Sequence, residues 1–218
     1  WSALYTGVFR ANQVLASIEK IRPNVTDEPQ ITKLAQIEAQ AYSLRGLFYF
    51  YLNNSFNNGN VPYINEIAEV EEDYYKKVTP SDEIKKYYRE DLQKALDLGL
   101  NDKWEKTDLG RITSWAVKAI LGKSYLYDKE YNKAAEYFKD IIDNGGFALV
   151  DDIVDNFTAA NEFNSESILE VSYSTQYNTE FGTWSESTLY NIWGMNVNGL
   201  GDAWLNTVPA FWLVEAFE

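Results

Sequence analysis

The sequence predicts a mostly α-helical fold, in which helical hairpins form a scaffold and an irregular, loop-rich region with little β-structure follows. Three observations predict this class. Apolar residues recur at spacings of three and four through five segments between residues 1 and 143. Proline or glycine stands where several of these segments end. After residue 147 the helical period fades. We therefore expect a helical scaffold over residues 1–147 and an irregular, aromatic-rich region over residues 148–218, packed on that scaffold.

The first two helices are expected at residues 1–22 and 30–53. Pro23 ends the first helix, whose apolar face consists of Leu4, Val8, Ala11, Leu15 and Ile18. The second helix keeps the same period, and its stretch 47–52 is apolar on every side. A helix of that kind is buried between neighbours. We therefore place the aromatic residues of this stretch in the core.

A loop and a third helix follow. Val61 precedes a proline and is expected to be extended. The acidic stretch 66–73 is expected to be a solvated loop. Thr79 is placed as the cap of a third helix, which runs to about Leu98 and is ended by Gly99.

Two further helices are expected at residues 112–127 and 131–143. The last of them carries an apolar stripe of Ala134, Ala135, Phe138, Ile141 and Ile142. Beyond it, residues 169–173 alternate between apolar and polar and predict a short strand. Residues 174–206 are interpreted as ordered loop, and residues 209–218 as the beginning of another helix.

The last two predicted helices carry the sequence pattern of a tetratricopeptide hairpin. The pattern is present as Leu121-Gly122, Tyr125, Ala134 and Phe138. Small residues at 122 and 134 let two helices approach closely, and the two aromatic side chains fill the space between them. The alternative is an ordinary helical bundle in which this pattern arose by coincidence.

The charge and the missing residue types exclude several classes of function. The chain has 19 Lys and Arg against 33 Asp and Glu, and its net charge of −14 repels nucleic acid and anionic lipid. It has no His and no Cys, which excludes common zinc sites, Cys nucleophiles, His-based triads and disulfides. Asp151, Asp152 and Asp155 could hold calcium, but they lack the spacing and the glycine of an EF-hand. We therefore expect no metal, no cofactor and no nucleic-acid partner.

Six blocks, in order along the chain, together resemble the SusD/RagB family. The first block is residues 1–12, and the second is residues 37–46 followed by the aromatic run 47–52 and then by Val61-Pro62. The other four are residues 88–95, 110–121, 166–171 and 214–218. The chain departs from the family in having Gly59-Asn60 where members tend to have Gly-Asp. It also begins at Trp1 without the signal peptide and lipid-carrying Cys of the family, and members continue past a block like 214–218. We therefore expect a chain truncated at both ends.

The resemblance implies a surface-exposed protein that is lipid-anchored in the outer membrane of Gram-negative bacteria. Members of the family form a lid over a TonB-dependent transporter of the SusC type. They hold an oligosaccharide, or in some cases a peptide, and pass it inwards without catalysing a reaction. The same role in carbohydrate uptake is therefore expected here.

The aromatic-rich region contains the candidate sugar-contacting residues. A flat aromatic side chain packs against the C–H face of a sugar, and neighbouring amides bond its hydroxyls. The segment 177–204 has this composition, and the leading candidates are Trp184, Tyr190, Asn191, Trp193 and Trp204. For any one of them, burial against the scaffold is the competing interpretation.

Two other functions remain open from the sequence. A tetratricopeptide hairpin can serve as a protein-interaction scaffold that binds peptides in a groove. A glycoside hydrolase needs two carboxylates across the sugar, and Glu162 with Glu166, or Asp151 with Asp155, are four residues apart. In a chain this acidic, such pairs are usually solvated, so we rank the hydrolase last.

Overall fold

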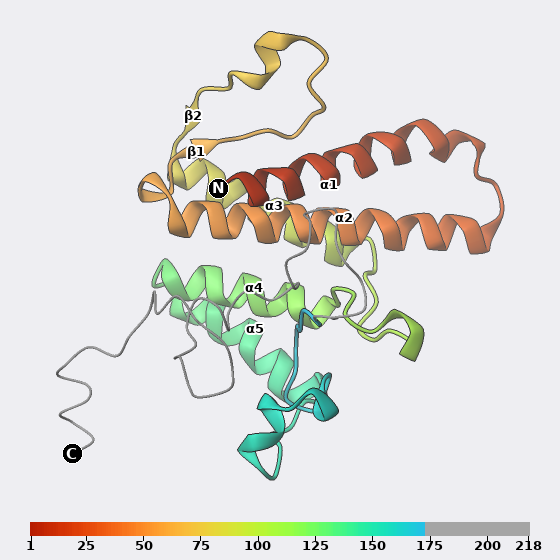
Figure 1. Ribbon diagram of the computed structural model, residues 1–218, viewed down its shortest axis with the longest axis vertical. Coiled ribbons are helices and arrows are strands. Elements are labelled where there is room, and N and C mark those ends of the chain that lie inside the picture. Colours follow the sequence, from red (N-terminus) through yellow and green to blue (C-terminus); the bar gives the residue numbers. More distant parts are fainter. Residues whose placement is uncertain (173–218) are drawn as a thin grey trace, which may run out of the picture. The chain divides into compact units, whose positions relative to one another are not determined.

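Five α-helices, one short β-ribbon and six short 3-10 helices make up the regular structure of residues 1–172, the part of the chain that the computed structural model describes (Figure 1). The helices are α1 (Ser2–Ile21), α2 (Glu28–Ser55), α3 (Ser81–Asp97), α4 (Ser114–Tyr127) and α5 (Tyr131–Asn144). Strands β1 (Val61–Pro62) and β2 (Val78–Thr79) pair antiparallel. Short 3-10 helices lie at Arg22–Asn24, Asn57–Gly59, Glu71–Tyr74, Lys106–Asp108, Ile153–Phe157 and Ala159–Asn161. The predicted mostly α class is thus confirmed.

The helix ends follow local chemistry at most of the predicted positions. Gly99 has φ +74°, and the N–H of Leu100 bonds the carbonyl of Ala95, which closes α3. Helix α4 is capped by Thr113, whose hydroxyl accepts from the N–H of Ala116 at 3.2 Å. The predicted cap at Thr79 is wrong. That residue pairs with Val61 in the β-ribbon, and α3 begins two residues later.

The strand predicted from residue 169 is also wrong for the stretch that the structure describes. Residues 169–172 form no strand. The carboxylate of Glu170 instead accepts hydrogen bonds from the N–H of Phe163 at 2.8 Å and from the hydroxyl of Ser167 at 2.9 Å. These local bonds fold residues 163–170 back on themselves, and within residues 1–172 no strand pairs with this segment.

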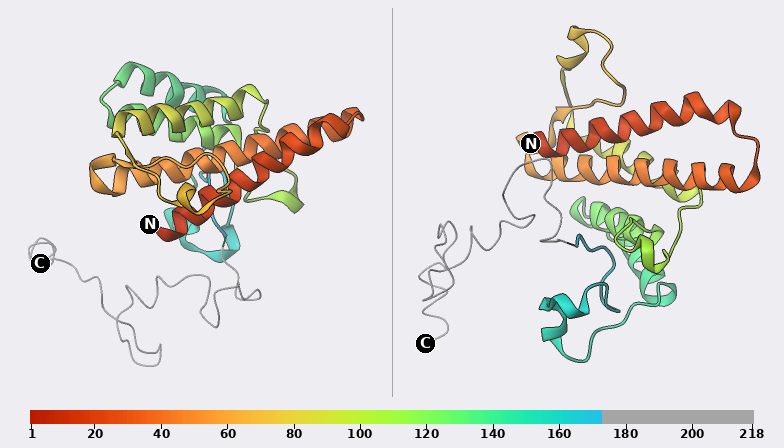
Figure 2. Two further views of the ribbon diagram at one scale, coloured as in Figure 1. Left: turned by 90° about the horizontal axis from the view of Figure 1, so that it is seen from above. Right: turned by 45° about the vertical axis from the view of Figure 1, so that its right-hand side comes forward.

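Helix α2 lies at the centre of the scaffold, between α1 and α3. Figure 1 shows α1 and α2 running antiparallel along each other, and Figure 2 shows α3 on the side of α2 that faces the α4–α5 pair. The stretch 47–52 contributes Tyr49, Phe50 and Leu52 to the core, as predicted. The placement of Tyr51 in the core is wrong, because this side chain is 48% exposed. It lines a shallow pocket between α4 and residues 166–169.

Helices α4 and α5 pack as the tetratricopeptide-like hairpin that the sequence predicts. A Cβ atom on Gly122 would lie 2.6 Å from the Cε1 atom of Phe138, so glycine is what permits this approach. Of the predicted stripe on α5, Ala134 and Ile141 are buried and Phe138 is half-buried. Ala135 and Ile142 are exposed, because within residues 1–172 the hairpin covers just one face of α5.

The boundary predicted at residue 147 stays a prediction, because most of the second region lies outside the described residues. In residues 148–172 the two short 3-10 helices are the regular structure, and the rest is irregular. The connection between β1 and β2 extends away from α1 and α2 in Figure 1. Within residues 1–172, no helix combines the length and the apolar character that spanning a bilayer requires.

Candidate functional site

The residues predicted to contact a sugar lie outside the described part of the chain. Their role stays a prediction; they are Trp184, Tyr190, Asn191, Trp193 and Trp204. Residues 1–172 contain a buried polar cluster, a cleft beside it, and an ionic network on the other side of α3.

A buried polar cluster joins the first three helices. Arg45 of α2 makes a bidentate pair with Asp91 of α3, with Nε–Oδ2 and Nη2–Oδ1 distances of 2.7 Å each. The Nη1 atom of Arg45 also donates to Oδ1 of Asn12 on α1 at 2.9 Å. All three residues are buried. The family-like blocks of the sequence contain them, but sequence reasoning singled out none; a charged residue on the buried face of a helix is the signal that could have found them.

The cluster and two tyrosines fix the backbone that follows β1. Asn12 donates to the carbonyl of Ile64 at 3.0 Å. The Tyr49 hydroxyl donates to the same carbonyl at 3.1 Å and accepts the N–H of Ile64 at 2.6 Å. The Tyr5 hydroxyl donates to the carbonyl of Pro62 at 2.7 Å. Side chains from α1 and α2 therefore set the start of the loop that extends between β1 and β2.

Burial governs the protonation of these groups. It raises the pKa of Tyr5 and Tyr49 well above the usual range, so both hydroxyls remain protonated and can donate. Burial also raises the pKa of Asp91, while the hydrogen bonds and charge of Arg45 oppose that rise. The Asp91 carboxylate thus depends on Arg45 to stay ionised in this position.

A cleft of about 480 Å³ opens beside the fixed segment, between the start of α1 and the loop after β1. We call it the N-terminal cleft; its lining includes Trp1, Tyr5, Phe9, Pro62, Ile64, Glu66 and Asp73. Trp1 is 50% exposed and Phe9 is 40% exposed. The Trp1 ring is held against Tyr5 and Phe56, with centroids 5.0 Å and 5.2 Å apart. An exposed ring can pack against a sugar while a neighbouring carboxylate, here that of Glu66, accepts from its hydroxyls.

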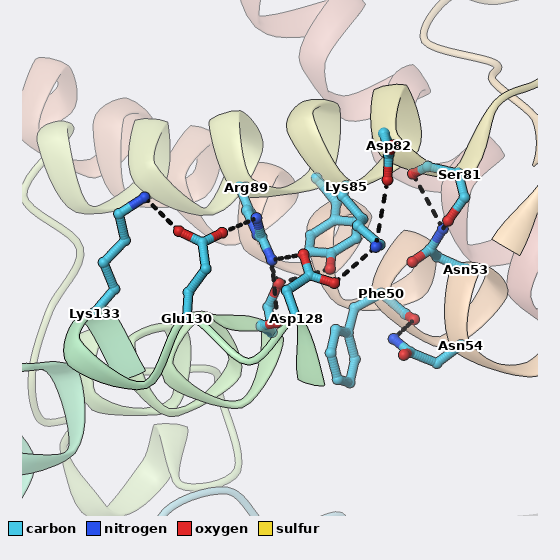
Figure 3. Close-up of polar contacts among 12 residues, drawn as sticks. Phe50, Asn53, Asn54, Ser81, Asp82, Lys85, Arg89, Asp128, Glu130 and Lys133 are labelled. Carbon is cyan, nitrogen blue, oxygen red and sulfur yellow. Dashed lines mark hydrogen bonds and ion pairs between the residues drawn. The ribbon is translucent and has the colours of Figure 1, made fainter. Parts of the chain in front are cut away.

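An ionic network ties α3 to the turn between α4 and α5 (Figure 3). Asp128 accepts from Lys85 at 2.7 Å and from Arg89 at 2.6 Å. Arg89 also donates to the hydroxyl of Ser124 at 2.7 Å, and its guanidinium lies 4.2 Å from the ring centroid of Tyr125. The charges are satisfied by one another, which indicates that this network stabilises the helix packing.

Replacing Asp128 with asparagine is expected to destabilise the chain at neutral pH by about 1 kcal/mol, because the network is partly screened by solvent. Partial burial raises the pKa of Asp128, but Lys85 and Arg89 outweigh this effect and leave the pKa below its usual value. A folded-state pKa below the unfolded one adds stability that is lost as the pH falls through the folded-state value. Asparagine does not titrate, so the difference from the parent should shrink in acid.

Urea unfolding of the parent and Asp128→Asn, repeated from neutral to acidic pH, measures this difference. Asp143→Asn is the matched control, since Asp143 pairs with the exposed Lys139 at the surface of α5. It should match the parent throughout. A deficit for Asp128→Asn that stays constant with pH would show that the carboxylate charge is not what stabilises the turn.

One acid of each pair considered for hydrolysis, Glu166 and Asp155, accepts hydrogen bonds from neighbouring residues. The carboxylate of Glu166 accepts from the N–H of Val150 at 3.2 Å and from Asn156 at 2.9 Å. These bonds lower the pKa of Glu166, whereas a catalytic acid needs a raised one. Asp155 accepts from Asn161 at 2.8 Å. In the described part of the chain, no group of three His, Cys, Asp or Glu side chains is arranged to hold a metal ion.

Comparison with known proteins places this helical scaffold in a family. Residues 1–126 match the SusD-like family model described as "Starch-binding associating with outer membrane". The chain belongs to the SusD-like family. The matched residues include α1 to α3, most of α4, and all three members of the buried polar cluster. The predicted family is thereby confirmed.

Relatives of known sequence and structure agree with the SusD-like assignment. A SusD-like protein from Bacteroides ovatus is 28% identical over 232 residues, which cover 100% of this chain and 40% of that protein. The structure of a laminarin binding SusD-like protein superposes with a TM-score of 0.74 and 32% identity, covering 85% of this chain and 40% of the other. A structure with a xylogluco-oligosaccharide gives a TM-score of 0.76 and 26% identity over 94% of this chain.

The SusD-like chain described here therefore spans 40% of the length of each of these relatives. Both solved structures are described with a glucan ligand: one protein is called laminarin binding, and the other structure is with a xylogluco-oligosaccharide. The likeness to these two structures extends over 85% and 94% of this chain, and the described part of it is mostly helical. The tetratricopeptide-like prediction is accordingly confirmed at the level of the fold.

Proposed function

We propose that this SusD-like chain is part of a carbohydrate-binding protein that captures oligosaccharides without cleaving them. The observation that carries the proposal is family membership over residues 1–126, together with structural relatives described by laminarin and xylogluco-oligosaccharide. The N-terminal cleft supports it, because exposed Trp1 and Phe9 lie beside the carboxylate of Glu66. A net charge of −14 is compatible with a neutral sugar and opposes a polyanion.

We further propose that the complete protein works at the cell surface, lipid-anchored in the outer membrane, and delivers its sugar to a SusC-type TonB-dependent transporter. The description of the family model as associating with the outer membrane supports this location. The transporter partner follows from the family resemblance.

The alternative of a tetratricopeptide-type protein-interaction scaffold rests on the α4–α5 hairpin. The charged residue in the turn of that hairpin is already paired with α3, since Asp128 binds Lys85 and Arg89. A peptide would have to displace these pairs, so the sugar is the better-supported ligand. The hydrolase alternative is weaker still, because the contacts of Glu166 hold its pKa low.

Calorimetry tests the proposal by titrating the chain with a panel of neutral polysaccharides. The panel includes laminarin and xyloglucan oligosaccharides. We expect weak binding that does not change with salt, because a neutral sugar offers no charge to screen. Trp184→Ala and Trp193→Ala should lower the affinity without changing the melting temperature. If both variants instead lose several kcal/mol of stability, as Trp→Ala does in cores, these residues pack and the site lies elsewhere.

The non-catalytic part of the proposal has its own measurement. Reducing ends should not accumulate when the chain is incubated for a long time with a glycan that it binds. Reproducible release that disappears in Glu162→Gln or Glu166→Gln would overturn the proposal and favour the hydrolase.

A further inference from the structure

A further pocket lies at the C-terminal end of α5. This pocket of about 470 Å³, which we call the α5 pocket, is formed by parts of segments 102–115, 144–147 and 163–170. Its volume is within the range of about 300–1,000 Å³ that is typical of small-molecule sites. Four half-buried aromatic side chains line it: Trp104, Trp115, Phe147 and Phe163.

The two tryptophans of the α5 pocket are held in place before any ligand arrives. The indole N–H of Trp104 donates to the carbonyl of Ile112 at 3.0 Å, and the Arg111 guanidinium lies 5.5 Å from its ring centroid. The Nζ atom of Lys118 lies 4.2 Å from the ring centroid of Trp115. Rings that are already ordered lose little entropy on binding, which strengthens the binding of a ligand that packs against them.

Phe163 adopts a backbone conformation that a bulky residue rarely takes, with φ +56°. Its N–H is bonded by the Glu170 carboxylate, which also binds Ser167. The Phe163 ring rests over the backbone of Gly110, where an added Cβ would lie 3.5 Å from the Cζ atom. Strain of this kind persists where the surroundings enforce it, and it is common at ligand sites. Here it turns an aromatic ring towards the α5 pocket.

The charge around the α5 pocket points to a neutral ligand. Its lining holds two acids, Asp102 and Glu170, and two bases, Lys103 and Arg111, so it carries no net formal charge. The chain as a whole carries −14. Ser165 at the pocket adds a hydroxyl group that can bond sugar hydroxyls, whereas the Asn164 amide already donates to Asn156 and accepts the N–H of Glu166. A lining without net formal charge gives no overall attraction to an anion or to a cation.

We propose that the α5 pocket is a sugar-binding subsite, separate from the N-terminal cleft and from the aromatic segment 177–204, that takes a ring of a neutral oligosaccharide. This proposal rests on the proposed function, because it gives the neutral oligosaccharides that are proposed as ligands a binding position on the scaffold. Phe163 and Trp104 supply aromatic surfaces to the ring, and the polar rim bonds its hydroxyls.

Two substitutions test the α5 pocket without relying on the same residue. Phe163→Ala removes an aromatic surface, and Leu169→Trp places bulk in the pocket from a side chain that is already 41% exposed. The probes are laminarin oligosaccharides and a xyloglucan oligosaccharide, titrated by calorimetry. We expect each pocket variant to weaken binding of the recognised probe by about tenfold, the worth of a good aromatic contact.

The matched controls make the same changes at exposed positions that do not line the α5 pocket. They are Phe157→Ala and Leu149→Trp, at side chains that are 83% and 82% exposed. Both should bind like the parent, and all four variants should melt like the parent. Parent-like affinity in Phe163→Ala and Leu169→Trp would overturn the subsite while leaving the proposed function in place. Failure of the parent to bind any neutral glycan in the panel would overturn both.

Discussion

Replacing Arg45 with alanine should lower the free energy of unfolding by about 3–5 kcal/mol, the largest loss that we expect in this scaffold. The substitution leaves the Asp91 carboxylate buried without the two 2.7 Å bonds that now satisfy it. It also removes the donor to Asn12, whose own bonds hold the segment after β1. Urea unfolding at neutral pH measures the loss.

The pH dependence separates this effect from simple loss of packing. Burial already raises the pKa of Asp91, and without Arg45 nothing opposes it. A carboxyl whose folded-state pKa is raised keeps its stability below the unfolded pKa and loses it as the pH rises through the folded value. The deficit of Arg45→Ala should therefore be smaller in acid than at neutral pH. A deficit that is equal at both pH values would contradict the buried-charge explanation.

Two further variants complete the test of the polar cluster. Arg45→Met combined with Asp91→Leu should recover much of the loss, because apolar residues of similar volume can replace a buried ion pair. Lys139→Ala removes an ion pair whose Lys139 side chain is 76% exposed and should have no measurable effect.

The helices could be predicted from sequence because their signals are local. The period of α1 and the glycine after α3 act within a few residues, and both predictions hold. The error at Tyr51 has a physical cause: a stretch that is apolar on every side does not reveal which face lacks a neighbour. The error at Thr79 arises because pairing with Val61, a distant residue, overrides the local capping preference.

The polar cluster is harder to predict because its members are far apart in the chain. Arg45 and Asp91 are 46 residues apart, and helical period says nothing about which helices meet. A signal was nevertheless present. Arg45 follows Ala41 and precedes Tyr49 at spacings of four, on a face whose other members are buried. A charged residue in that position requires a partner, but the partner's identity depends on the tertiary fold.

The hairpin prediction has the second-largest expected effect. Gly122→Leu should destabilise the chain by about 2 kcal/mol or more, through overpacking against α5. A Cβ at this position would lie 2.6 Å from Cε1 of Phe138, and the remaining leucine atoms need still more room. Leucine favours a helix over glycine by about 1 kcal/mol, so the observed loss understates the steric cost. Thermal and urea unfolding measure it.

Phe138 decides whether the clash has the proposed origin. When Phe138→Ala is added to Gly122→Leu, the double variant should lose less free energy of unfolding than the sum of the two single losses. The smaller side chain at position 138 leaves the space that leucine needs. Ala135→Leu is the control, since it enlarges an exposed side chain on the same hairpin and should have little effect. A Gly122→Leu variant that melts like the parent would mean that Gly122 is not at the helix contact. Strict additivity with Phe138→Ala would show that the loss has another source than the contact between these two side chains.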